Sequence, residues 1–309
     1  MAKQHLLKAE RLHDIWNNAL PPVLTIDPGD TVTIECVAIR HGDVSAETPD
    51  GPVIPASRWQ GHPLTGPIYI RGARPGDTLA IEILDIQHHG WGFTYCRPGA
   101  GLLADFGPRL KVWHFEGDWA EFRPGIRVPI MPFLGVMGLA PAEPGDHPTG
   151  PPTATGGNLD IRHLTKGTTL YLPVATEGAL FSAGDGHAAQ GDGEVCITAI
   201  EAPLTATLRF ELLKDRPVAG PQFVTAAGPL TRAGERGYYC TTGVGPDLHG
   251  AAQEAIRAMV IHIQQAYGLD RDDAYMLCSV AVDLKISEIV NRPHWVVSAY
   301  LPLGVFVEC

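Results

Sequence analysis

The sequence lacks clusters of basic residues. Its 23 lysines and arginines are outnumbered by 34 aspartates and glutamates, which gives a formal net charge of −11 at pH 7. Nucleic-acid-binding proteins gain their affinity from lysine and arginine gathered against phosphates. We therefore expect no nucleic-acid partner.

Long apolar runs are also missing. No stretch approaches the roughly 18 uninterrupted apolar residues of a membrane-spanning helix. Residues 1–16 contain none of the apolar core that a secretory signal requires. We expect no membrane partner and a cytoplasmic location.

The sequence has no common nucleophile or nucleotide motif. It contains no CxxC pair, no GGSSGGS-like serine block, no GxSxG elbow, no GxGxxG turn and no P-loop. Cys196 and Cys240 lie in alternating, strand-like patterns, where burial suppresses thiolate formation. We expect reduced thiols in the core at the scattered positions 36, 96, 196, 240, 278 and 309. Covalent serine catalysis, cysteine catalysis and nucleotide cofactors are therefore disfavoured.

Short strands dominate the predicted fold. Apolar and polar residues alternate over 32–36 and 79–83, each time after a Pro-Gly-Asp turn, as in half-buried strands. Further strands are predicted over residues 68–70, 113–116, 169–174, 195–201, 205–213, 238–242 and 295–301. The 35 glycines and 27 prolines between them fit turns that join short strands.

Two helices are predicted near the C-terminus. Over residues 248–267 apolar side chains recur at helical spacing, Asp247 can cap the first turn, and Gly268 can end the helix. A second helix is predicted over about 270–280. We predict a β-rich α+β fold of packed sheets, sandwich- or barrel-like, with these two helices. Residues 1–309 are expected to form a single domain, with the Pro- and Gly-rich stretch 141–157 as a long active-site loop.

The segment 181–201 concentrates polar chemistry on a backbone of small residues. It reads FSAGDGHAAQGDGEVCITAIE, so that Asp185, His187, Gln190, Asp192 and Glu194 stand among glycines and alanines. Carboxylates beside an imidazole are donors for a divalent metal. The alternative is a Gly-Asp hairpin whose carboxylates only cap their own turns.

Three histidine and aspartate positions are candidates for the site. Small neighbours leave the His187 imidazole free to reach a metal, with Asp185 as a partner and Glu194 as a further ligand or base. Asp160 follows two glycines, although it could instead cap a short helix. His62 precedes a proline and is a candidate substrate or metal contact, or a turn histidine without a role. The spacing does not match the HExxH helix of zinc proteases.

Five blocks of the sequence resemble the acetamidase/formamidase family. They cover residues 62–83 (HPLTGPIYIRGARPGDTLAIEI), 130–145 (IMPFLGVMGLAPAEPG), 156–164 (GGNLDIRHL), 181–201 and 276–291 (MLCSVAVDLKISEIVN), in the family's order. The resemblance implies a hydrolase of formamide, acetamide and related small carbon–nitrogen compounds, metal-containing in some members, that forms a homodimer or a larger homo-oligomer. The loop RHGDVSAET, from Arg40, departs from the family pattern, which leaves the substrate open.

These observations combine into one mechanistic hypothesis. Asp160 and His187 bind a divalent metal, most simply Zn²⁺, and Glu194 is the third ligand or the general base. Backbone amides near Gly157 or Gly186 stabilise the oxyanion, and His62 contacts the substrate. The pocket is lined by Phe133, Met137 and Trp91.

The predicted reaction converts a small linear amide into ammonia and a carboxylate. Two alternatives stay open. One is hydrolysis of another C–N bond, in a lactam or a guanidine-derived carboxyamide. The other is a non-catalytic, ligand-binding homologue, and the discriminating observation is whether Asp160, His187 and Glu194 meet in space.

Overall fold

The computed structural model describes residues 2–52, 55–100, 108–123, 126–190, 194, 197–227, 236–268, 282–303 and 306. Within them the chain is built almost entirely of strands, which form two large sheets and one small ribbon. This confirms the predicted β-rich fold of packed sheets.

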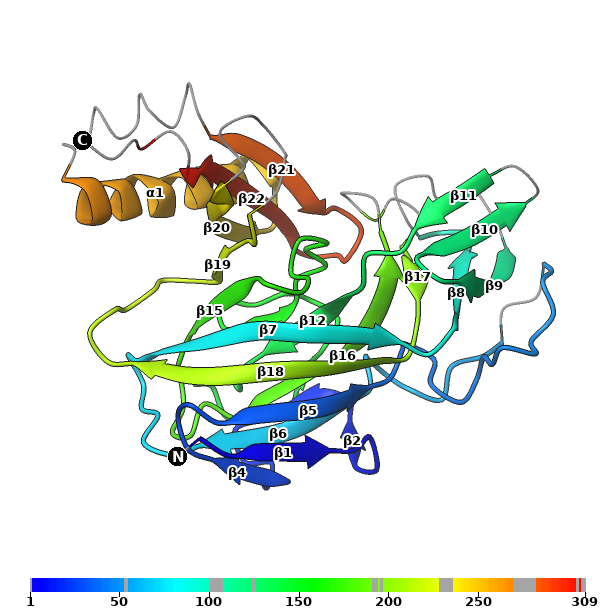
Figure 1. The fold of residues 1–309 in the computed structure, drawn as a ribbon, viewed down its shortest axis with the longest axis horizontal. Helices are drawn as coiled ribbons and strands as arrows, with labels where there is room; N and C mark the ends of the chain where they lie inside the picture. The colour runs from blue at the N-terminus through cyan, green and yellow to red at the C-terminus, as the bar shows by residue number, and fades with distance from the viewer. Residues whose placement is uncertain are drawn as a thin grey trace.

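The first sheet has nine strands. In spatial order they are β1 (Gln4–Leu7), β5 (Thr31–Cys36), β18 (Leu204–Leu213), β7 (Thr78–His88), β15 (Thr169–Pro173), β19 (Gln222–Val224), β20 (Tyr238–Gly245), β22 (Trp295–Pro302) and β21 (Asp283–Glu288). The long antiparallel pair β7 and β18 crosses the middle of the molecule, and β20, β21 and β22 gather at one end of it with the helix (Figure 1).

The second sheet has eleven strands and carries the site. Its main path is β11 (Ile126–Pro129), β10 (Trp119–Arg123), β9 (Arg109–Glu116), β8 (Trp91–Cys96), β17 (Ile200–Glu201), β16 (Phe181–Ala189), β12 (Phe133–Gly138) and β14 (Gly156–Asn158). Off this path, β6 (Leu64–Ile70) pairs with β16, β2 (Leu12–His13) and β4 (Leu24–Ile26). A separate ribbon joins β13 (His147–Pro148) to β3 (Ile15–Trp16), so part of the predicted loop 141–157 is paired.

The main core joins the two sheets. Isoleucine and leucine side chains from β5, β7 and β18 pack with residues of β6, β12 and β16 in one buried cluster. Phe181 of β16 meets Phe210 of β18 edge to face, with ring centroids 5.1 Å apart. The alternation over the predicted strands therefore turns one face of each strand into this core.

The helix predicted over 248–267 is confirmed as α1 (Leu248–Tyr267). Asp247 caps it by accepting a hydrogen bond from Gly250 N at 2.7 Å, and Gly268 ends it in the left-handed conformation. Its apolar face, which includes Met259 and Ile263, packs over β20 and β22. The second predicted helix, at about 270–280, lies outside the described residues.

One local expectation for residues 181–201 needs correction. Residues 181–189 form a strand that is buried along its whole length, and this strand and β17 form an antiparallel hairpin whose connection carries Glu194. The strand predicted over 195–201 is limited to β17, because residues 197–199 are not in strand conformation and residues 195–196 lie outside the described part. Among the described residues, no helix combines the length and apolar character needed to cross a membrane.

Candidate active site

The site is built around His187 on β16. The register of β12 and β16 places Phe133 opposite His187, and the Phe133 ring meets the imidazole edge to face with centroids 5.0 Å apart. Gly135 lies two residues further along β12, next to Asp185. Asp185 and His187 therefore share one face of the strand, since alternate residues point the same way.

Three carboxylates face His187 Nε2. Asp185 Oδ2 and Glu201 Oε2 each lie 3.3 Å from this nitrogen, and Glu194 Oε1 lies 3.9 Å away. Glu201 comes from β17, which pairs with β16, while Glu194 lies on the connection between the two strands. All four side chains are buried.

The other imidazole nitrogen is held by Gln190. The Gln190 Nε2 group donates a hydrogen bond to the Asp160 carbonyl at 2.9 Å. The Gln190 Oε1 atom therefore faces His187 Nδ1 at 3.0 Å and accepts a hydrogen bond from it. In the neutral imidazole the lone pair then lies on Nε2, directed at the carboxylates. Metal-bound histidines are fixed in the same way by a partner on the second nitrogen.

Asp160 enters the site from the segment after β14. Its Oδ1 lies 3.9 Å from His187 Nδ1, and its Oδ2 accepts a hydrogen bond from Asn291 Nδ2 at 3.0 Å. Its backbone N–H donates to Gly135 O at 3.2 Å. A strand of the second sheet and a turn of the first sheet therefore both hold this residue.

Strained backbone accompanies the carboxylates. Asp160, Asp185 and Glu194 adopt φ values of +47°, +53° and +46°, in the left-handed region that L-residues rarely occupy. Each such conformation costs about 1 kcal/mol or more and persists only where the surrounding structure enforces it. Strain of this kind is concentrated at functional sites in proteins.

Burial and mutual repulsion shift the ionisation of the cluster. Burial, together with neighbouring carboxylates, raises the pKa of Asp160 and of Glu194 well above the ordinary range, and burial also raises the pKa of Glu201. For Asp185 burial acts in the same direction, but His62 and His187 outweigh it and lower the pKa. Burial would lower the pKa of His187, yet Glu201 and Asp185 outweigh it and raise the pKa well above its usual value.

The arrangement of the cluster fits a divalent cation. Four buried polar atoms of the cluster residues have no hydrogen-bond partner within the described part of the chain: Asp160 Oδ1, Asp185 Oδ1, His187 Nε2 and Glu201 Oε2. Two overlapping sets of donor atoms, Asp160–Asp185–His187 and His187–Glu194–Glu201, each lie within 4.8 Å of one another. Oxygen donors with one imidazole suit a divalent ion, whose charge would offset the repulsion between carboxylates.

Gly135 keeps space open at the centre. A Cβ at this position would lie 2.7 Å from Asp160 Oδ1, 2.9 Å from His187 Cε1 and 3.0 Å from Asp185 Oδ2. Any side chain there would enter the cluster, so glycine is the residue that leaves room for a small group among these donors.

The structure brings the three predicted central residues together and places the others around them. Asp160, His187 and Glu194 meet in one cluster. His62 reaches its edge, with Nε2 3.6 Å from Asp185 Oδ2. At the predicted glycines, a Cβ on Gly186 would meet Ala202 O at 2.3 Å, and one on Gly157 would face Trp16 Nε1 at 3.7 Å; the role of their backbone amides stays a prediction.

The remaining sequence-based candidates lie apart from the cluster, except Phe133. Met137 belongs to the main core, and Trp91 stacks on Phe93 with centroids 6.2 Å apart. In the loop that departs from the family pattern, Asp43 pairs with Arg58 at 2.8 Å.

Sequence reasoning missed four residues of the site. Glu201, Gln190, Gly135 and Asn291 were assigned no role, although Gln190 was noted as a polar member of segment 181–201. A carboxylate at the end of the apolar run VCITAIE was a usable signal for Glu201, because a strand that ends in the core seldom buries an unpaired charge. Asn291 offered no such signal, since it lies 131 residues from Asp160.

One serine does have a histidine partner, which the sequence did not suggest. His13 Nδ1 is 2.8 Å from Ile15 O, and His13 Nε2 is 2.9 Å from the Ser182 hydroxyl. Ser182 is buried against Gly66, where a Cβ would lie 2.4 Å from the hydroxyl oxygen. The pair ties β2 to β16 and leaves no space for a substrate beside the hydroxyl.

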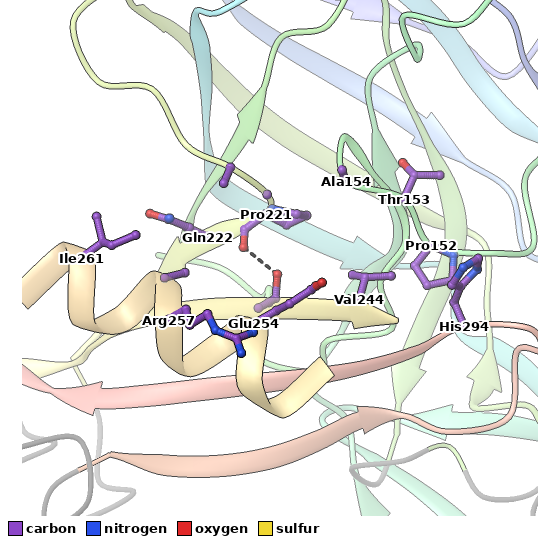
Figure 2. A pocket seen from close by; sticks show the side chains of 14 residues that line it. Pro152, Thr153, Ala154, Pro221, Gln222, Val244, Glu254, Arg257, Ile261 and His294 are labelled. Carbon is purple, nitrogen blue, oxygen red and sulfur yellow. Dashed lines mark hydrogen bonds between the residues drawn. The ribbon is translucent and has the colours of Figure 1, made fainter. Parts of the chain in front are cut away.

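A groove of about 630 Å³ lies elsewhere, between α1, β19, β20 and residues 152–154. Pro221 and Val244 contribute apolar lining, while Glu254, Arg257 and His294 bring polar groups to it (Figure 2). None of the five clustered residues Asp160, Asp185, His187, Glu194 and Glu201 lines this groove. The buried cluster and the groove are separate features.

Comparison with known proteins identifies the family. The profile described as the Acetamidase/Formamidase family matches residues 1–145 and 145–308. The chain belongs to this family. The acetamidase/formamidase chain is therefore an amidohydrolase that acts on carbon–nitrogen bonds other than peptide bonds.

Individual relatives agree with this assignment. The crystal structure of an acetamidase from Bacillus halodurans is 34% identical, covers 97% of this chain and 98% of its own, and superposes with a TM-score of 0.88. A formamidase from Methylophilus methylotrophus is 26% identical over 372 residues, which cover 96% of this chain and 89% of the relative. A γ-lactamase from Delftia acidovorans, 23% identical with a TM-score of 0.65 over 99% of this chain and 94% of its own, shares the fold.

Proposed function

We propose that this chain is a metal-dependent hydrolase of small linear amides, such as formamide or acetamide, which releases ammonia and a carboxylate. One observation carries the proposal: Asp160, His187 and Glu194 converge, together with Asp185 and Glu201, around the space that Gly135 leaves. A degenerate, ligand-binding homologue would have no reason to keep four buried carboxylates and strained backbone together.

The metal is proposed to be Zn²⁺. His187 Nε2, Asp185, Glu201 and Asp160 supply the donors, and their unpartnered buried atoms support this assignment. Such an ion, when bound, polarises the amide carbonyl and lowers the pKa of water to about 7. Gln190 keeps the His187 ring in the orientation and tautomer that binding requires.

Glu194 is proposed as the general base. Of the three carboxylates that face His187 Nε2, it lies furthest from that nitrogen, at 3.9 Å, and burial raises its pKa, which makes it a stronger base. It would accept the proton of the attacking water and deliver it to the departing nitrogen. Amide hydrolysis needs this second transfer because the amine leaves poorly without protonation. The alternative role, a third protein ligand, gives a different mutant phenotype.

A small substrate is favoured by what surrounds the cluster. The Phe133 ring meets His187 edge to face, and Gly135 leaves beside Asp160, His187 and Asp185 a space that a single Cβ would fill. His62, whose side chain is 12% exposed, stands at the edge and is proposed to orient the substrate. Hydrolysis of a lactam or of a guanidine-derived carboxyamide keeps the same site and remains the alternative substrate class.

We also propose that the protein works in the cytoplasm as a homodimer or larger homo-oligomer. Leu284 and Ile286 are 49% and 42% exposed on β21, the last strand of the described part of the first sheet. Apolar side chains on an edge strand are typical of an interface between copies. Light scattering after gel filtration tests this, and a monomer mass at all concentrations would contradict it.

The functional proposal is tested by metal analysis and ammonia release from a panel of small amides. His187→Ala should lose bound metal and turnover together, because one protein ligand is removed. Glu194→Gln should keep most of the metal and lower turnover by about two to four orders of magnitude. The exposed Glu116→Gln is the matched control. Full metal content and full activity in both site variants would refute the site assignment.

A further inference from the structure

The Asp160 carboxylate is held by a single side chain among the described residues. Its Oδ2 accepts a hydrogen bond from Asn291 Nδ2 at 3.0 Å, whereas its Oδ1 is buried and has no hydrogen-bond partner in the described part of the chain. The backbone of Asp160 is fixed separately, through Gly135 O and Gln190 Nε2. The orientation of the Asp160 carboxylate about its Cβ–Cγ bond therefore depends on Asn291.

Asn291 is itself held rigidly. The backbone N–H groups of Asn291 and Val290 both donate to Oε1 of Glu288, a fully buried residue at the end of β21. Trp295 Nε1 donates to Ile289 O at 2.8 Å and closes the other side of the turn. The amide group that meets Asp160 is thus fixed by the edge of the first sheet, although the cluster is built on the second.

We propose that Asn291 is a positioning residue, which occupies Asp160 Oδ2 and thereby presents Oδ1 to the cation position beside His187. This inference rests on the proposed metal-dependent function. The three atoms nearest to a Cβ at Gly135 belong to Asp160, His187 and Asp185 and not to Asn291, so the effect of Asn291 passes through Asp160. The carboxyl oxygen that it leaves free is the one that a Cβ at Gly135 would approach at 2.7 Å.

Asn291→Ala tests the proposal through Co²⁺, titrated calorimetrically into chelator-treated protein and followed by its absorption spectrum. The variant should bind Co²⁺ about 10- to 100-fold more weakly than the wild type, the range seen when groups that orient a metal ligand are removed. Its Co²⁺ spectrum should change, and kcat at saturating Co²⁺ should fall while KM changes little. If Asn291→Ala does not fold, Asn291→Ser carries the same expectation.

Asn18→Ala is the matched control. Like Asn291→Ala, it removes an asparagine side chain that donates hydrogen bonds. The acceptors of Asn18 are the backbone carbonyls of Pro141 and Ala142, at 3.2 and 3.0 Å. Its Co²⁺ affinity and spectrum should equal those of the wild type. A similar melting temperature of both metal-free variants would show that the Asn291 effect is local.

Variants of Glu288 test whether the turn that Glu288 holds affects metal binding by positioning Asn291. Glu288→Gln retains an oxygen that can accept both backbone hydrogen bonds, so its Co²⁺ affinity should stay near that of the wild type. Glu288→Ala should weaken Co²⁺ binding as Asn291→Ala does, and the double variant should be no weaker than the weaker single variant, because both act through one contact.

The two proposals fail in different ways. Equal Co²⁺ affinity and an unchanged spectrum in Asn291→Ala and Asn18→Ala would overturn the role of Asn291 while leaving the metal-dependent function intact. Absence of Co²⁺ binding by the wild-type protein would overturn both.

Discussion

A substitution at Gly135 can test whether the space among the clustered donors is needed for metal binding and catalysis. Its φ is not in the left-handed region, so alanine fits the backbone. Its Cβ would nevertheless lie within 3.0 Å of Asp160, His187 and Asp185 atoms. Gly135→Ala should therefore abolish metal binding and amide hydrolysis in a folded protein. Circular dichroism and metal analysis check this. Gly220→Ala, where a Cβ would meet nothing within 4 Å, is the control, and normal activity in Gly135→Ala would show that the space is not used.

Catalysis without a protein nucleophile is also tested at single residues. Burial raises the pKa of the Cys36 and Cys240 thiols, so neither supplies a thiolate. The Ser182 hydroxyl has a histidine partner but lies against Gly66. Alanine at position 36, 240 or 182 should leave turnover of acetamide largely intact. Mass spectrometry of the working enzyme should show no acyl adduct, and an adduct on Ser182 would overturn the water-based mechanism.

Residue types predicted the centre of the site but not its supports. His187 and Glu194 could be named from sequence because carboxylates and an imidazole stand together among small residues, and Asp160 because the family resemblance favoured a site residue over a helix cap. Asn291 and Gly135 could not, because their roles arise from contacts between distant segments. An asparagine in a turn and a glycine in an apolar strand are ordinary in sequence, and only the fold gives them meaning.

At the scale of elements, prediction succeeded where local signals were complete. The helix α1 has a cap, an apolar face and a terminating glycine, all encoded within Asp247–Gly268. The strand β16 has no β-branched residue and five glycines or alanines among nine positions, so its sequence resembles a turn. Its small residues instead let the backbone of Pro63 and Leu64 approach Gly184 closely, and let residues 202–204 approach Gly186. Tertiary packing thus overrides local propensity there.

The attachment of β1 depends on one carboxylate and has a defined pH dependence. Burial opposes ionisation of Asp30, but hydrogen bonds from Lys3 N, His5 and Asp27 N lower its pKa to about 2. Because the folded pKa lies below the unfolded value of 3.8, the contribution is complete above about pH 4 and is lost as the pH falls toward 2. Asp30→Asn should lower the free energy of unfolding at pH 7 by about 1–2 kcal/mol.

Urea denaturation between pH 2 and 7 measures this contribution. The difference between wild type and Asp30→Asn should shrink as the pH falls below about 4. The exposed Asp118→Asn serves as control. A difference that stays constant down to pH 2 would show that the Asp30 contacts do not depend on its charge.

At the scale of the whole molecule, the site joins the two sheets. The cluster is built on β12, β16 and β17 of the second sheet, while Asn291 reaches Asp160 from the turn after β21 of the first. Residues from most of the chain length therefore meet at one point inside a shared core. A change in the charge of the cluster should accordingly alter the stability of the entire fold and not of one loop.

The metal-free protein should consequently lose stability as the pH rises from about 5 to 8. The folded pKa values of Asp160, Glu194 and Glu201 are raised, so these groups hold protons that the unfolded chain releases above about pH 4. His187, whose pKa is also raised, adds stability that is complete below about pH 6.5 and declines as the pH rises through its folded pKa.

Asp185 does not change this slope, because its lowered pKa makes its contribution constant above about pH 4. A bound cation replaces the missing protons, so the metal-loaded protein should melt at a higher temperature with a flatter pH dependence. Thermal melts of chelator-treated and Zn²⁺-loaded protein across this range check both expectations. Glu194→Gln removes one of the titrating groups and should reduce the slope of the metal-free protein. When no cation is bound, the clustered carboxylates must be stabilised by bound protons, which are lost as the pH rises. A melting temperature of the metal-free protein that rises with pH would therefore contradict the raised pKa values of the cluster.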